Sequence, residues 1–195
     1  KLRLKQKNYI LKLIFHFFFQ KKFLNILDGL HNISKEEKKD VNNFVNARNL
    51  FVIGNGIDIE KINLELPKNL SKKDNIEKIK FGVLGRIAKE KNILGLIKGL
   101  NLLNKNNLRK IELIIIGEIN DFAQDIIKYS NNLGLQSTVK FVGKVSNHEK
   151  WIILNDLDVY IQPSFDEAGL SIALREAMYL NCPILVTRDC KPSAV

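Results

Sequence analysis

The chain has 195 residues, of which 45% are hydrophobic and 27% are charged. This balance is that of a folded globular protein with a sizeable core, and it excludes the disordered and fibrous classes. The formal net charge of +10 favours anionic partners: phosphorylated ligands, anionic lipid or nucleic acid. The two cysteines and three scattered histidines form no disulfide framework and no metal-binding set, so we expect a reduced, cytoplasmic compartment.

The pattern of residues 1–33 predicts one or two basic helices. Their common apolar face comprises Ile10, Leu13, Ile14, Phe17 and Phe18. This apolar run is too short to span a bilayer, and we favour packing against a domain over a peripheral membrane contact. Ser34 and Glu37 have the spacing of a capping box, which predicts a helix to about residue 46. A strand at residues 51–53 then leads into a tight turn at residues 54–56.

Residues 60–77 are mostly polar and lack a sustained period, which predicts an irregular linker. Beyond it, predicted strands alternate with predicted helices. The strands are 79–84, 111–117, 139–143, 159–162 and 184–186, and the helices are 93–103, 122–133, 146–154 and 170–178. This alternation predicts an α/β fold with a doubly wound parallel sheet. Because the chain starts without methionine and stops soon after an apolar strand, we expect a fragment truncated at both ends.

Two loops at the carboxyl ends of predicted strands carry the candidate chemistry. Arg86 and Lys91 flank the turn from the first strand of this part into its helix, where a guanidinium, an ammonium and free amides can meet a diphosphate. On these two residues alone, an ordinary solvated loop stays an open alternative. The second loop follows Pro163 and leads into a helix that contains Glu176, an unusual place for a charge unless a polar group faces it.

The run from Pro163 to Met178 resembles the signature of the family 4 retaining glycosyltransferases of the GT-B fold (glycosyltransferase group 1). It has a Pro-Ser pair, a glutamate, a small-residue loop and a second glutamate followed by Ala-Met. Upstream, the turn at residues 55–58 and the Gly-Arg…Lys pattern at residues 85–91 are similar to the family's, although Gly54 replaces its usual proline. The two glutamates stand nine positions apart instead of eight, so either Asp166 or Glu167 fills the first carboxylate position.

This resemblance implies a domain organisation and an activity. Residues 1–56 would be the tail of the N-terminal acceptor domain, 57–77 the interdomain linker, and 78–195 an incomplete, Rossmann-like C-terminal donor-binding domain. The enzyme would move a hexose from a UDP- or GDP-linked sugar to a glycan or lipid-linked acceptor with retention of configuration. It would act in bacterial cell-surface polysaccharide or lipopolysaccharide synthesis at the inner face of the membrane. We expect the fragment to be inactive alone.

The resemblance also implies roles for individual residues. Glu167, Arg86 and Lys91 would be catalytic, and Glu176 would accept hydrogen bonds from the two ribose hydroxyls. The implied donor-binding set is Arg86, Lys91, Gly143, Lys144, Val145, Gly169, Leu170, Ser171 and Glu176. No metal and no cofactor beyond the nucleotide sugar is implied, because side chains supply the positive charge.

Three other classes of protein are alternatives to a glycosyltransferase. A Rossmann dehydrogenase half is excluded because the turns at Gly85 and Gly117 lack the Gly-x-Gly-x-x-Gly spacing. A non-catalytic nucleotide-binding domain and a basic nucleic-acid-binding module stay open. We expect no nucleic-acid partner, since no nucleic-acid-binding signature is present. Steep salt dependence of oligonucleotide binding, without competition by UDP or GDP, would favour the nucleic-acid alternative.

Overall fold

A computed structural model describes residues 9–43, 49–67, 78–165 and 170–190. It divides into two compact units, one formed by residues 1–55 with 192–195 and the other by residues 56–191. The second unit contains both candidate loops.

The first unit combines helices with a small parallel sheet. Its elements are α1 (Tyr9–Phe15), a π-helical segment (His16–Gln20), α2 (Lys21–Asn25), β1 (Leu30–Asn32), α3 (Lys35–Asn42) and β2 (Leu50–Val52). The expectation that helices continue to residue 33 is wrong, because residues 30–32 form a strand that pairs with β2. Asn32 stabilises this pairing, since its Nδ2 donates to the carbonyls of Leu30 and Phe51 at 3.3 and 3.2 Å.

The helical face expected in the first unit is exposed where it is described. Ile10, Ile14 and Phe18 are 72%, 49% and 67% exposed. Ser34 caps α3 as predicted, by accepting a hydrogen bond from the Glu37 amide, but the capping box is not complete, because the Glu37 carboxylate accepts from the amide of Ile33 and not from that of Ser34. This helix ends at Asn42, and residues 44–46 of the expected helix lie outside the described residues.

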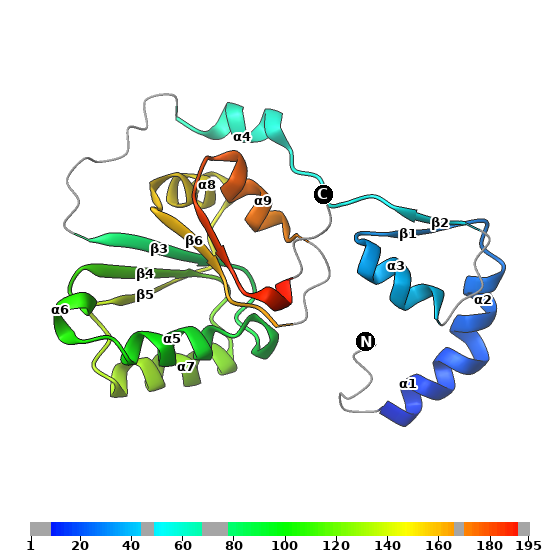
Figure 1. Ribbon diagram of the computed structural model, residues 1–195, viewed down its shortest axis with the longest axis horizontal. Coiled ribbons are helices and arrows are strands. Elements are labelled where there is room, and N and C mark those ends of the chain that lie inside the picture. Colours follow the sequence, from blue (N-terminus) through cyan, green and yellow to red (C-terminus); the bar gives the residue numbers. More distant parts are fainter. Residues whose placement is uncertain (1–8, 44–48, 68–77, 166–169, 191–195) are drawn as a thin grey trace. The chain divides into compact units, whose positions relative to one another are not determined.

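The second unit confirms the predicted α/β fold with a doubly wound parallel sheet. Five parallel strands are arranged in the order β5-β4-β3-β6-β7 (Figure 1). Their bounds are β3 Ile79–Leu84, β4 Ile111–Ile116, β5 Val139–Gly143, β6 Val159–Gln162 and β7 Ile184–Val186. Strands β4 and β5 lie on one side of β3 and strands β6 and β7 on the other, so the strand order reverses between β3 and β6. The carboxyl ends of β3 and β6 therefore flank the topological switch point, where ligands bind in such sheets.

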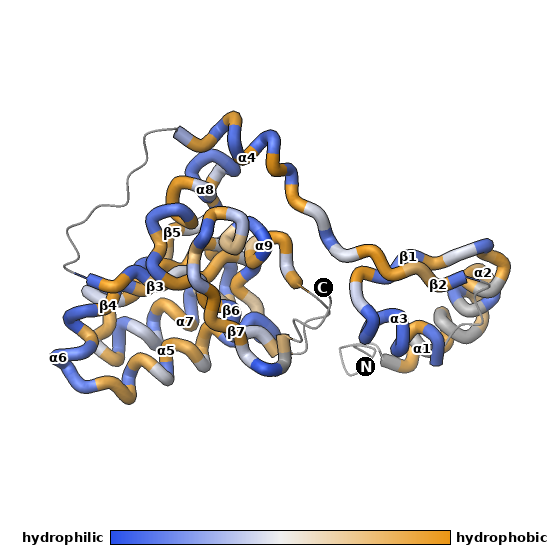
Figure 2. The backbone as a smooth tube through the Cα atoms, turned by 45° about the horizontal axis from the view of Figure 1, so that its top comes forward, coloured by the Kyte–Doolittle hydropathy of each residue, from blue (hydrophilic) through white to orange (hydrophobic). Residues whose placement is uncertain are grey.

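Helices cover both faces of this sheet (Figure 1). One face carries α5 (Ile93–Asn101) and α7 (Asp121–Asn132), and the other carries α4 (Ile59–Glu65), α8 (Asn147–Asp156) and α9 (Ile172–Tyr179). Short turns complete the unit: α6 (Lys105–Leu108) and 3-10 turns at Lys89–Lys91 and Arg188–Cys190. Figure 2 shows the difference between the mostly hydrophobic α5, which supplies Ile93, Ile97 and Leu100 to the core, and the hydrophilic α6.

Helix α4 corrects the expectation of an irregular segment at residues 60–77. Asp58 caps it by accepting a hydrogen bond from the Lys61 amide at 3.0 Å. Ile62 is fully buried with side chains of α8 and α9. A seven-residue helix with one buried side chain is too short to produce a visible period in the sequence. Residues 68–77 of the expected linker lie outside the described residues.

Residues typical of helix ends lie at the ends of α7, α8 and α9. Ser146 and Glu149 form a complete capping box at the start of α8. Gly134 follows α7 with a φ of +71°, and Asn181 follows α9 with a φ of +55°. Leu170, just before α9, and Leu174 and Ala177 within it are buried, whereas Met178 is 46% exposed.

Candidate functional site

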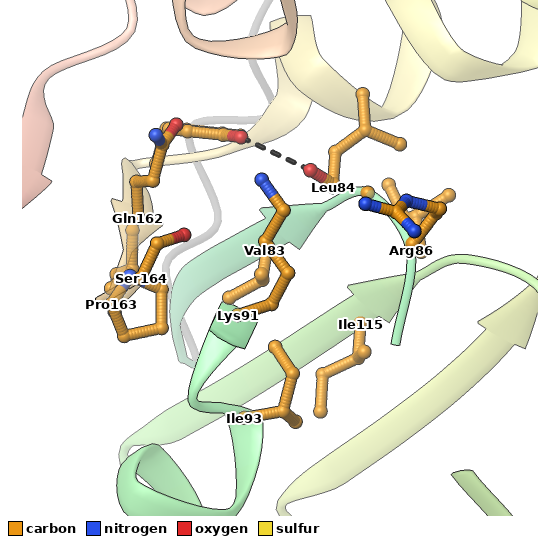
Figure 3. Close-up of a pocket in the computed structure, with 13 residues that line it drawn as sticks. Val83, Leu84, Arg86, Lys91, Ile93, Ile115, Gln162, Pro163 and Ser164 are labelled. Atoms are coloured by element: carbon orange, nitrogen blue, oxygen red, sulfur yellow. Dashed lines mark hydrogen bonds between the residues drawn. The ribbon is translucent and has the colours of Figure 1, made fainter. Parts of the chain in front are cut away.

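The described part of the chain has a pocket at the switch point of the sheet. It encloses about 290 Å³, including its open mouth. Its wall is formed by residues 83–86 at the end of β3, Lys91 and Ile93 after the following turn, residues 115–116 of β4 and residues 160–164 at the end of β6. Figure 3 shows these side chains around the pocket, with the Tyr160 hydroxyl donating to the Leu84 carbonyl at 3.3 Å.

The turn after β3 brings Arg86 and Lys91 to this pocket together. Gly85 begins the turn with a φ of +149°, and Asn92 ends it with a φ of +53°, immediately before α5. The Lys91 side chain is half-buried and rises between Ser164 and Arg86 in Figure 3. The Arg86 side chain is 73% exposed, with its Nη2 lying 3.3 Å from Glu90 Oε1. Two cations from one short turn thus line the pocket, and the Glu90 carboxylate offsets part of the charge of Arg86.

A close backbone approach fixes the shape of this turn. The Gly85 amide donates to the Ile116 carbonyl at 3.0 Å, which ties the turn to the end of β4. The next residue, Gly117, lies so close that a Cβ atom there would be 2.1 Å from the Gly85 carbonyl oxygen. Glycine at position 117 therefore allows the backbone of the basic turn to lie against β4.

The end of β6 forms the opposite wall and carries Ser164. This residue is 1% exposed, and its Oγ has no hydrogen-bond partner among the described residues. Sequence reasoning missed it as a site residue. The available signal was its position two residues after the end of a strand beside the switch point. Asp166, Glu167 and Gly169, which follow it and were expected to contact the donor, lie outside the described residues.

Glu176 is held inside α9 by two donors from α8. Glu176 is 5% exposed. Its Oε1 accepts hydrogen bonds from Trp151 Nε1 at 3.1 Å and from Lys150 Nζ at 2.8 Å. The Lys150 ammonium also lies 5.1 Å from the centre of the Trp151 ring. Among the described residues no donor reaches Oε2. The sequence predicted a polar group facing Glu176 but did not identify these two partners.

Glu176 does not line the pocket that contains Arg86 and Lys91, and neither do the other described members of the predicted donor-binding set. Leu170 is 5% exposed and packs in the core. Ser171 caps α9 by accepting from the Leu174 amide, and it donates to Gln162 Oε1 at 2.7 Å. Gly143 has a φ of +84° at the end of β5, followed by Lys144, which is exposed, and Val145, which is half-buried.

Two further kinds of site are absent from the described residues. Among them, no group of three or more histidine, cysteine, aspartate or glutamate side chains is placed to hold a metal ion. None of the helices in the described ranges has the length and apolar character needed to cross a membrane.

The sheet and the two basic residues at its switch point indicate a class of protein. A doubly wound parallel sheet with an arginine and a lysine at its switch point is typical of domains that bind phosphorylated nucleotides. Residues 67–195 match the family model described as "Glycosyl transferases group 1", and the chain belongs to this family. The resemblance found in the sequence is thereby confirmed at this level, and the narrower assignment to family 4 stays a prediction.

Individual relatives agree with the family. The chain is 33% identical over 149 residues to the uncharacterized glycosyltransferase MJ1069 of Methanocaldococcus jannaschii, covering 75% of this chain and 37% of that protein. It is 32% identical over 143 residues to the capsular polysaccharide biosynthesis glycosyltransferase CapH of Staphylococcus aureus. This match covers 73% of this chain and 37% of CapH. The chain thus spans about 37% of the length of these curated relatives.

A solved structure supports the fold. The crystal structure of Anabaena Alr3699/HepE in complex with UDP and glucose has a TM-score of 0.71 at 19% sequence identity, covering 87% of this chain and 47% of that one. The sheet of the second unit is thus that of a GT-B glycosyltransferase, as expected for its Rossmann-like C-terminal domain.

Proposed function

We propose that this chain binds the donor of a retaining glycosyltransferase, a hexose linked to UDP or GDP, for transfer to a glycan or lipid-linked acceptor. Membership of the glycosyltransferase group 1 family supports transferase activity in general. The naming of CapH for capsular polysaccharide biosynthesis supports the acceptor class, and the UDP in the HepE complex supports the nucleotide. The peripheral membrane contact considered from the sequence stays a prediction.

The observation that carries this proposal is the meeting of Arg86 and Lys91 at one pocket between β3 and β6. A diphosphate carries its charge on several oxygens, and a forked guanidinium and a point-charged ammonium can bind different oxygens simultaneously. As the sugar leaves, negative charge develops on the diphosphate, so the same two cations would also stabilise the transition state. Side chains alone would supply this charge, with neither a metal nor a further cofactor.

Glu176 would recognise the ribose. A carboxylate accepts hydrogen bonds at both oxygens, and two donors from α8 already hold Oε1. The remaining oxygen would accept from the ribose hydroxyls. Glu167 would lie near the donor sugar, as the sequence resemblance implies, and the segment at Gly143, Lys144 and Val145 would line the base.

Calorimetric titration of the 195-residue chain with UDP, GDP and an oligonucleotide tests the proposal. UDP or GDP should bind, and raised salt should weaken binding. Arg86→Lys should weaken binding by about 1 kcal/mol or more although the charge is kept, because the planar fork is lost. Lys91→Met should also weaken it, whereas Lys98→Met, which removes a charge from the exposed side of α5, should not. Absence of binding to either nucleotide, or oligonucleotide binding that neither nucleotide competes for, would overturn the proposal.

A further inference from the structure

The wall of the pocket contains a buried hydroxyl that makes no hydrogen bond to the described residues. Ser164 is 1% exposed, and its Oγ has no partner among the described residues, whereas buried polar side chains are nearly always hydrogen-bonded. Leaving a hydroxyl unpaired in a protein interior is unfavourable, so such a group needs an explanation. Its position on the pocket wall offers one, because a ligand in the pocket could supply the missing partner.

The backbone around Ser164 is fixed from two sides. The Ser164 carbonyl accepts a hydrogen bond from Thr187 Oγ1 at 2.6 Å, just after β7. The amide of the next residue, Phe165, donates to the Glu90 carbonyl at 2.8 Å. Glu90 directly precedes Lys91, so this bond joins the segment that carries Ser164 to the turn that carries Lys91. The backbone segments that carry the hydroxyl and the ammonium are therefore joined before any ligand arrives.

Both groups face the same space. In Figure 3 the Ser164 hydroxyl points from the wall formed by β6 toward the side where the Lys91 side chain rises, with Arg86 beyond it. A neutral hydroxyl beside an ammonium is suited to an anionic oxygen, since the hydroxyl can donate to a lone pair that the ammonium leaves open. The unpaired Oγ thus fits a phosphate oxygen better than an apolar part of a ligand.

We propose that Ser164 is a ligand-binding residue whose Oγ donates a hydrogen bond to a phosphate oxygen of the nucleotide diphosphate held by Arg86 and Lys91. This inference rests on the proposed function, since it names a further contact within the same site. It also explains why a buried hydroxyl is retained that has no partner among the described residues.

Ser164→Ala separates this role from a structural one. The hydroxyl has no partner among the described residues, so its removal should leave the thermal unfolding midpoint unchanged or raise it. The same variant should bind UDP about tenfold more weakly, as expected for the loss of a hydrogen bond to a charged group. Ser34→Ala is the matched control: Ser34 is fully buried, but its hydroxyl accepts from the Glu37 amide. That control should lower the unfolding midpoint and leave UDP affinity unchanged.

Ligands of decreasing charge locate the contact. The loss caused by Ser164→Ala should be large for UDP, smaller for UMP and absent for uridine. A loss that appears with UDP-glucose but not with UDP would instead place the hydroxyl at the sugar and overturn the assignment to phosphate. Equal UDP affinities of parent and Ser164→Ala would overturn this inference alone. A parent chain that binds neither UDP nor GDP would overturn the proposed function and this inference together.

Discussion

Trp151 donates its indole hydrogen to Glu176 across 3.1 Å, and both residues are buried on facing helices of the second unit. The bond joins residues that are 25 positions apart in the sequence, and Lys150 adds an ion pair to the same carboxylate oxygen. A glutamate in a largely apolar helix is thereby made compatible with folding, because its charge is paired and hydrogen-bonded. The carboxylate is also oriented, since both donors reach Oε1.

Glu176→Ala should destabilise the protein by about 2–3 kcal/mol, because it leaves the Lys150 ammonium and the Trp151 N–H without their shared acceptor. The Lys150 side chain is only 16% exposed, so water replaces the lost partner poorly. Urea denaturation followed by tryptophan fluorescence and circular dichroism measures the loss. The control is Glu65→Ala, which breaks a surface pair with Lys61 at 3.8 Å and should cost less than about 1 kcal/mol. Equal losses for the two variants would contradict the structural role of the buried pair.

Glu176→Gln should separate ribose recognition from stability. The amide oxygen can still accept from Lys150 and Trp151, which turns the NH₂ group toward the position of Oε2. A donor then replaces the acceptor offered to the ribose hydroxyls, so UDP affinity should fall by about 1.5–3 kcal/mol. Titration of UDP and 2′-deoxy-UDP into parent and variant measures this effect. A variant that still prefers UDP as strongly as the parent does would show that Glu176 does not contact the ribose.

Gly117→Ala should destabilise the second unit by about 1–3 kcal/mol, the usual cost of overpacking. Its Cβ would lie 2.1 Å from the Gly85 carbonyl, so the backbone of the turn before Arg86 would have to move. UDP affinity should therefore fall as well. Gly99→Ala is the opposite case: a Cβ at this position in α5 meets no atom within 4 Å, and alanine there should stabilise by about 0.5–1 kcal/mol. Thermal and urea unfolding of both variants test the contrast, and similar shifts of the same sign would argue against the close approach.

The capping box of α8 should produce a pH-dependent contribution to stability. Two hydrogen bonds lower the pKa of Glu149 from its ordinary value of 4.5. The bond from the Ser146 amide has the larger effect and the bond from the Ser146 hydroxyl the smaller one. Because the folded-state pKa is the lower one, this contribution is fully present above about pH 4.5 and is lost as the pH falls through the folded-state pKa. Glu149→Gln should thus be less stable than the parent at neutral pH, and the difference should shrink in acid. A difference that stays constant between pH 7 and pH 3 would rule out this linkage.

Local patterns in the sequence were sufficient to predict the main features of the second unit. Runs of apolar residues predicted the five strands, because the burial of a strand is reflected in residues that are neighbours in the chain. The turn with Arg86 and Lys91 was found for the same reason, since both residues lie between one strand and the next helix. The family resemblance depended on a similarly local run.

Only the tertiary structure decided which groups meet across the fold. The pairing of Leu30–Asn32 with β2, the docking of Ile62 against α8 and α9, and the two donors on Glu176 all join segments distant in sequence. The hydrophobic periodicity of a segment does not indicate such partners, because the strand order and the layers that pack on the sheet determine which segments meet. The hydroxyl of Ser164 is the clearest case: the sequence shows only a serine after a strand, and the fold shows that this serine is buried with no hydrogen-bond partner among the described residues.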